Sequence, residues 1–261
     1  MSKLNLSDSL TELPFNKIFF KLAVPNVCAT FFAATTVIFD LWYIGKIGIS
    51  ELAGVAYIFP IYMLTSMLSN GAFGGAVSGA TARAFGSKNI TQAECIFRSA
   101  ILIAFLGAII MMLLFFSFSE KFLIYYKVDK QVSLAAITYG NLLLKGIFLI
   151  WLFNIIISVT RGSGNTTIPA ISWLIVLFFH ILFATLNFNF DDRNILLTNS
   201  VSLLNGMFSF TSLEWSAISL LSGYLAGMIF ILGFYLFGNH SYSFKFHEIF
   251  KLRGFFKLIK S

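Results

Sequence analysis

The stretch IFRSAILIAFLGAIIMMLLFFSF, residues 96–118, contains one charged side chain, Arg98, and is otherwise almost wholly apolar. An α-helix needs about 20 apolar residues to cross the hydrocarbon core of a membrane. Lipid offers no hydrogen bonds to the backbone, so a crossing segment of this kind is stable there only as a helix. The stretch therefore predicts a membrane-spanning helix.

Five further segments of similar character lie on either side of this one. The whole chain of 261 residues is 58% hydrophobic and 11% charged, whereas soluble domains contain roughly 25% charged residues. This composition excludes a soluble enzyme, a disordered chain, a disulfide scaffold and a nucleic-acid-binding protein. We expect an all-α integral membrane fold with six transmembrane helices, at residues 18–44, 52–76, 96–118, 133–159, 168–188 and 215–237.

The spans divide the chain into three parts. Residues 1–17 form a polar N-terminal segment, residues 18–237 a six-helix transmembrane lobe, and residues 238–261 a basic tail. Lys and Arg are more frequent on the side that holds both termini, although the loop at 121–130 carries lysines on the other side. Because basic loops stay inside, we expect cytoplasmic termini and a bacterial-type cytoplasmic (inner) membrane. Apolar and basic residues recur at helical spacing in the tail, which predicts an amphipathic linker helix on the inner leaflet.

Two features are expected to shape the helices. Pro25 and Pro60 lie early in the first and second spans, and each removes a backbone donor and can kink its helix. Small residues recur from Gly71 to Ala80 at the end of the second span. Such residues let helices approach closely, so this run predicts tight helix packing.

Ionisable residues within the spans are the first candidates for function. A charge in hydrocarbon is costly and usually faces a cavity or a partner. Asp40 lies in the outer half of the first span, Lys145 near the middle of the fourth, and His180 in the fifth. Asp40 is either functional or a wetted carboxylate at the span boundary. Lys145 is either functional or a structural counter-ion for Asp40, and His180 is either functional or a neutral side chain bonded to a carbonyl.

No catalytic constellation or metal site is evident. His180, His240 and His247 are scattered, with neither cysteine nor carboxylate at ligand spacing. No phosphate-binding loop of the Gly-Lys-Ser/Thr type is present. The sequence therefore predicts no enzyme and no cofactor. Transport driven by an ion gradient needs only a buried titratable group.

Four stretches together resemble the multidrug and toxic compound extrusion (MATE) family of cation-coupled efflux transporters. Their order and spacing over the first part of the chain make the resemblance fairly specific. They are TELPFNKIFFKLAVP (residues 11–25), DLWYIGKIG (40–48), IFP (58–60) leading to ARAFG (82–86), and RGSGNTTIP (161–169).

The resemblance implies two six-helix lobes with a substrate cavity between them, of which this chain resembles the N-terminal lobe only. Asp40 matches the first-helix carboxylate implicated in proton or sodium coupling. Tyr139 and Asn154 fall where polar fourth-helix residues line the cavity. The family often has Asn and Asp four residues apart in the fifth helix, where this chain has His180 and Ala184. That difference favours H⁺ over Na⁺ as the coupling ion, bound at a proton site that uses Asp40 and draws in His180. No match to the family's sixth-helix hydroxyl is found.

We therefore expect a cation-coupled antiporter that exports organic or xenobiotic compounds, cationic or amphipathic in character, present here as a half-length lobe in the lipid bilayer. One alternative is a flippase for lipid-linked oligosaccharides, which shares the fold and requires a cation that binds phosphate. Another is an inactive chain, or one half of a split transporter that needs a homodimer partner or a separate C-terminal lobe.

Overall fold

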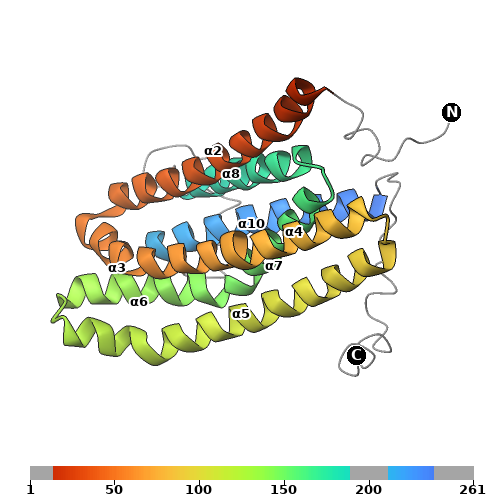
Figure 1. Cartoon of the computed structure of the whole chain (residues 1–261). Coiled ribbons are helices and arrows are strands. Elements are labelled where there is room, and N and C mark those ends of the chain that lie inside the picture. Colours follow the sequence, from red (N-terminus) through yellow and green to blue (C-terminus); the bar gives the residue numbers. More distant parts are fainter. Residues whose placement is uncertain (1–13, 189–210, 238–261) are drawn as a thin grey trace.

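The computed structural model describes residues 14–188 and 211–237, and all regular structure within these residues is helical (Figure 1). The expected basic tail, most of the expected N-terminal segment and most of the connection before the sixth span lie outside the described residues. The helices are α2 (Phe15–Ile47), α3 (Ile49–Ser66), the π-helical η1 (Met67–Ala72), α4 (Phe73–Gly86), α5 (Ile90–Tyr125), α6 (Lys130–Lys145), α7 (Ile147–Gly162), α8 (Thr167–Phe188) and α10 (Ser212–Phe237).

The expected all-α membrane fold is confirmed. Five helical stretches are long and apolar enough to cross a membrane, and a sixth crossing is made if α6 and α7 count as one bent span. In Figure 1 the first turns of α2, the end of α4, the start of α5 and the end of α10 gather at one end of the bundle. This arrangement fits six alternating crossings with both ends of the described chain on one side.

The second crossing is longer than expected. The sequence predicts a span at 52–76, but helix continues from Ile49 to Gly86 through α3, η1 and α4. Helix also continues through Pro25 and Pro60, and the irregular turn lies beyond the second proline, in η1. A π-turn inside an α-helix is rare and often lies at a functional site.

The fourth crossing is broken, which the sequence did not predict. Instead of one helix over 133–159, α6 and α7 meet at Gly146 and are bent by 49°. A Cβ at Gly146 would lie 2.4 Å from a methyl group of Leu221 on α10. The glycine therefore allows α10 to approach the break. No proline lies near Gly146, so the usual sequence signal for a helix kink is missing.

Small residues set the distances between several helices. A Cβ at Gly74 would lie 2.5 Å from Ser158 Oγ on α7, and a Cβ at Gly223 on α10 would lie 2.6 Å from the Val176 carbonyl on α8. Within the small-residue run, the expected tight packing is found at Gly74. At Gly71 and Gly75 a Cβ would meet nothing within 4 Å.

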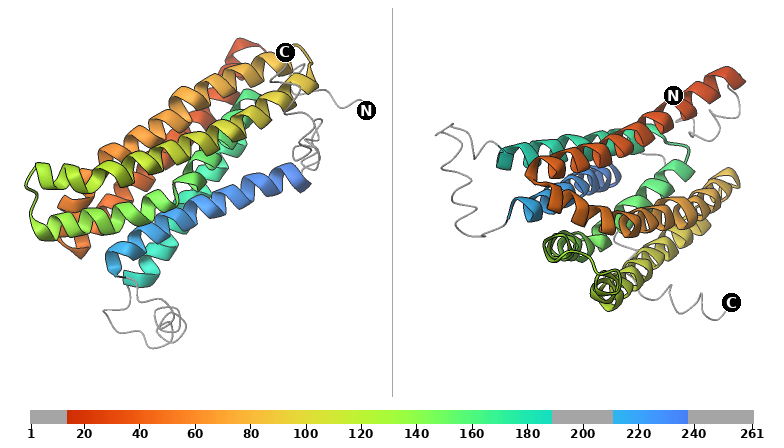
Figure 2. Two further views of the ribbon diagram at one scale, coloured as in Figure 1. Left: turned by 90° about the horizontal axis from the view of Figure 1, so that it is seen from below. Right: turned by 90° about the vertical axis from the view of Figure 1, so that its left-hand side faces the viewer.

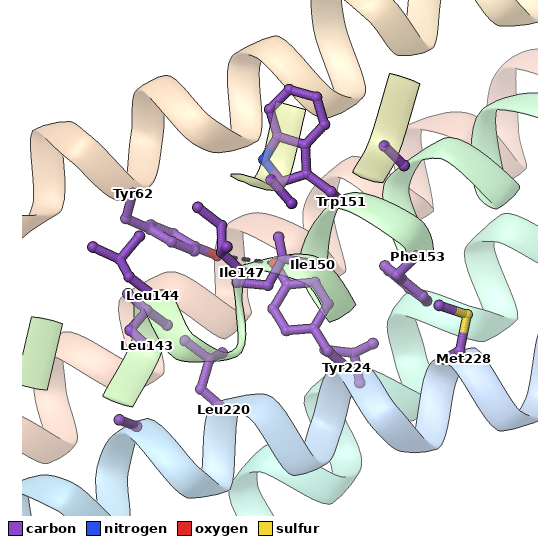
Figure 3. Close-up of a cluster of buried hydrophobic side chains, with 14 of the residues drawn as sticks. Tyr62, Leu143, Leu144, Ile147, Ile150, Trp151, Phe153, Leu220, Tyr224 and Met228 are labelled. Carbon is purple, nitrogen blue, oxygen red and sulfur yellow. Dashed lines mark hydrogen bonds between the residues drawn. The ribbon is translucent and has the colours of Figure 1, made fainter. Parts of the chain in front are cut away.

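The molecule is apolar outside and partly polar inside. Large apolar side chains such as Phe20, Ile38 and Leu113 are exposed, as expected of surfaces that contact lipid. The centre combines a packed cluster of aromatic and aliphatic residues, shown in Figure 3, with buried polar groups. Figure 2 shows α8 and α10 side by side, and both also contact α2. These three helices bring the polar groups of the candidate site together.

Candidate functional site

Asp40 is buried, and both of its carboxylate oxygens accept hydrogen bonds. Tyr139 on α6 donates its hydroxyl to Oδ2 at 2.6 Å, and Ser216 on α10 donates to Oδ1 at 2.8 Å. Burying a carboxylate is costly unless such partners are present. The boundary interpretation of Asp40, as a carboxylate wetted at the span end, does not fit this enclosed position.

His180 on α8 completes the site. Its Nε2 atom lies 3.6 Å from Asp40 Oδ1, and its side chain is fully buried. On the other side of the ring, Nδ1 lies 3.1 Å from Ser219 Oγ. The edge of the ring also contacts Phe39, with the two ring centroids 5.3 Å apart. The imidazole ring of His180 therefore lies between Asp40 and Ser219.

The proton positions around His180 depend on its tautomer. Ser219 Oγ lies 3.1 Å from His180 Nδ1 and 2.8 Å from the Ser216 carbonyl oxygen, and its single hydroxyl proton can be donated to either acceptor. His180 Nε2 lies 3.6 Å from Asp40 Oδ1 and has no hydrogen-bond partner among the described residues. A proton carried by Nε2 or by the carboxylate can therefore be shared between these two groups.

A second pair of hydroxyl groups lies beside this site. The hydroxyl oxygens of Tyr62 on α3 and Tyr224 on α10 are 2.9 Å apart, as the dashed line in Figure 3 shows. A cavity of about 10 Å³ lies among Asp40, Tyr62 and Tyr139. This volume is near the lower limit for one water molecule. The tyrosines extend the polar interior from α2 to α3, α6 and α10.

The predicted site residues do not all meet. Tyr139 joins Asp40 and His180, as described above. Asn154 is buried elsewhere, between α7 and η1, where its Nδ2 donates to Ser69 Oγ at 2.8 Å. Lys145 is exposed at the break between α6 and α7 and forms no ion pair with Asp40 in the part of the chain that the structure describes. His180, and not Lys145, is the basic group beside Asp40.

The sequence analysis missed the hydroxyl groups of the sixth span. Ser216 and Ser219 lie one turn apart, and Gly223 follows on the same face of α10. Polar and small residues that recur at helical spacing in an otherwise apolar span indicate the helix face that packs against other helices, so these serines could have been predicted to be buried. Tyr62 was also missed, because a tyrosine in a span is equally common at membrane interfaces.

Comparison with known proteins identifies the family. The family model MatE matches residues 25–186, which is more than half of the chain. The chain belongs to the MatE family. This confirms the resemblance seen in the sequence. MATE proteins are transporters and not enzymes, which also confirms the expectation that the chain is no enzyme.

Solved structures show the same fold as this MATE chain. A crystal structure of MATE in the bent conformation matches with a TM-score of 0.74 and 16% identity, over 93% of this chain and 49% of that one. A MOP superfamily transporter from Pyrococcus furiosus matches with a TM-score of 0.75 and 15% identity, over 98% of this chain and 52% of that one. The chain therefore spans about half the length of these structures and fits the N-terminal lobe that the resemblance implied.

A curated relative is similar over a shorter stretch. It is described as an FAD transporter of Shewanella oneidensis and is 26% identical over 97 residues. The match covers 37% of this MATE chain and 21% of that protein.

Proposed function

We propose that the chain forms one lobe of a proton-coupled antiporter, which exports small organic compounds across the cytoplasmic membrane. The observation that carries this proposal is the buried pair of Asp40 and His180, which lies between spans and has room for one proton. An ionisable pair of this kind is expensive in hydrocarbon and is functional by default. We favour H⁺ over Na⁺ because the partner of the carboxylate is an imidazole, which can carry a proton and supplies no oxygen ligand for Na⁺.

Proton binding would change how Asp40 holds its neighbours. The carboxylate accepts from Tyr139 on α6 and from Ser216 on α10, and it faces His180 on α8. A protonated carboxyl group loses accepting capacity and gains a donor. Because the three partners lie on three different helices, protonation biases how those helices pack around α2. A transporter that alternates between two conformations can use this bias to release cargo outside.

A second six-helix unit would complete the transport pathway. The solved MATE structures are about twice as long as this chain, and transporters built from repeats place their sites between the repeats. We propose that the facing wall comes from a second six-helix lobe, supplied either by a different polypeptide segment or by a second copy of this one. Cross-linking in native membranes distinguishes the two, because a second copy cross-links only to itself.

The test is export driven by a pH gradient in membrane vesicles that contain the protein with any bound partner. Ethidium and fluorescein serve as cationic and anionic probes. We expect Asp40→Asn to abolish the pH-driven component of export while exchange without a gradient persists. Glu51→Gln is the matched control, because Glu51 contacts Ser50 at the start of α3, outside the site. Unchanged pH-driven export by Asp40→Asn would refute the proposal.

A flippase for lipid-linked oligosaccharides is the second candidate. Such a protein needs a cation that binds phosphate, and Lys145 does not support this role, because it is exposed at a helix break. Another cation, Arg161, lines a cavity between α2, α4 and α7. Depletion of the protein separates the candidates. Accumulation of lipid-linked precursor with unchanged dye export would favour the flippase.

A further inference from the structure

A second cavity lies away from Asp40, at the end of the bundle where α2 begins. It has a volume of about 610 Å³ and lies between α2, the η1–α4 region and the junction of α7 with α8. Among the described residues that line it, Arg161 is the charged one, and none is acidic. Asn26 on α2 lines this cavity and precedes Asp40 by 14 residues. The cavity and the proton site are thus separated by about 21 Å along the same helix, at about 1.5 Å per residue.

Arg161 has donor capacity that the described residues leave unused. Its Nη2 donates to Asn70 Oδ1 and, at 3.3 Å, to Ser158 Oγ. Its Nε is buried and has no hydrogen-bond partner among residues 14–188 and 211–237. A guanidinium group carries five N–H donors and accepts nothing, and it matches the planar geometry of carboxylate and phosphate. A buried donor without a partner is costly, which points to an acceptor that residues 14–188 and 211–237 do not supply.

The π-turn explains how Arg161 comes to be held there. η1 inserts an irregular turn into the second crossing, and its Asn70 accepts the hydrogen bond from Arg161. The neighbouring Ser69 accepts a hydrogen bond from Asn154. Ser69 and Asn70, which are neighbours in η1, thus each bond to a side chain of α7, and these two contacts fix the position of the guanidinium group.

The rest of the cavity combines positive potential with apolar surface. Thr166, just before the first turn of α8, lines it, and its hydroxyl donates to the Lys21 carbonyl on α2 at 3.3 Å. The N-terminus of a helix carries a partial positive charge that adds to that of Arg161. Phe15 and Phe19 on α2 add aromatic side chains to the lining.

We infer that this cavity binds an amphipathic organic anion, with its carboxylate, phosphate or sulfonate group at Arg161 and its apolar body against the aromatic wall on α2. This inference names the cargo of the proposed antiporter. Binding of the anion stands on the cavity alone, and its export rests on the proposed function. It replaces the expectation of a cationic cargo. The same chemistry is offered by a water-soluble solute and by an anionic lipid.

The test compares two dyes with the same xanthene ring, fluorescein, an anion, and a cationic rhodamine ester. Binding to the purified full chain is measured by fluorescence polarisation. We expect fluorescein to bind more tightly than the rhodamine, and Arg161→Gln to weaken fluorescein binding by about ten- to a hundredfold, since hydrogen bonds to charged groups contribute about 1.5–3 kcal/mol. Arg83→Gln, which removes an exposed cation of α4 outside the cavity lining, should leave binding unchanged.

A second pair of variants does not touch Arg161. Gly75 lines the cavity, and a Cβ there would meet nothing within 4 Å, so Gly75→Leu extends a side chain into the cavity without a clash. Gly71→Leu is the control, because it also meets nothing within 4 Å but does not line the cavity. Only Gly75→Leu should weaken fluorescein binding. Both replace a helical glycine, which favours folding.

The outcomes are separable from those of the proton site. Fluorescein binding is measured at a single pH without a gradient, so its loss in Arg161→Gln is read independently of proton coupling at Asp40. In phosphatidylcholine nanodiscs, displacement of fluorescein by added phosphatidylglycerol would identify a lipid as the source of the anion, and no displacement would identify a soluble solute. Equal binding of the two dyes, or equal weakening by Arg161→Gln and Arg83→Gln, would overturn the inference.

Discussion

Replacing Gly223 by alanine tests whether the packing of α10 on α8 positions the proton site. The new Cβ would lie 2.6 Å from the Val176 carbonyl oxygen and 3.4 Å from both Cβ and N of His180. Restoring an ordinary contact with the carbonyl requires α8 and α10 to separate by about 0.8 Å, and strain of this kind costs about 1–3 kcal/mol. The movement would carry His180 away from Ser219 and Asp40.

Gly233 provides the matched control on the same helix, because a Cβ there meets nothing within 4 Å. We expect Gly223→Ala to unfold at a lower temperature than Gly233→Ala, by about 2–4 °C for each kcal/mol. It should also reduce pH-driven export, whereas Gly233→Ala should export like the native protein and be at least as stable, because alanine replaces a helical glycine. Thermal unfolding in lipid and vesicle transport measure the two effects. Equal stability and equal transport of the two variants would refute the packing argument.

The remaining predictions concern the polar groups. Ser216→Ala removes one hydrogen bond to Asp40. A hydrogen bond to a charged acceptor contributes about 1.5–3 kcal/mol, so pH-driven export should fall about tenfold or more, while circular dichroism shows that the protein stays folded. A double-mutant cycle with Tyr62→Phe and Tyr224→Phe should give a coupling energy of about 1 kcal/mol in thermal unfolding, because the two hydroxyls contact each other; additive effects would contradict this. Lys145→Gln should leave pH-driven export unchanged, because Lys145 lies outside the site, and a loss equal to that of Asp40→Asn would show that the assignment of His180 as the partner is wrong.

The sequence predicted the spans well because a membrane crossing depends on the hydropathy of a segment and on little else. Its errors lie where tertiary contacts decide. The break at Gly146 follows from the approach of Leu221, which lies 75 residues further along the chain. The π-turn at η1 follows from contacts with α7 that no local pattern announces.

The candidate site was predicted in part for the same reason. Asp40 and His180 were identifiable because ionisable residues in apolar spans are rare. Their pairing was one of two options, since Lys145 was also a candidate counter-ion for Asp40 until the helices were placed. Ser216 was missed because serine is common in spans, where it often bonds only to its own helix. Arg161 lies just beyond the predicted fourth span at 133–159, where a basic residue is ordinary, whereas the structure shows that it lines a cavity.

The most direct test of the account is a pH-difference infrared spectrum of the protein in lipid. If Asp40 is the group that binds the coupling proton, acidification should produce a carboxyl C=O stretching band in the native protein and in Glu51→Gln. That band should be missing from Asp40→Asn. A spectrum of Asp40→Asn identical to that of the native protein would contradict the central claim.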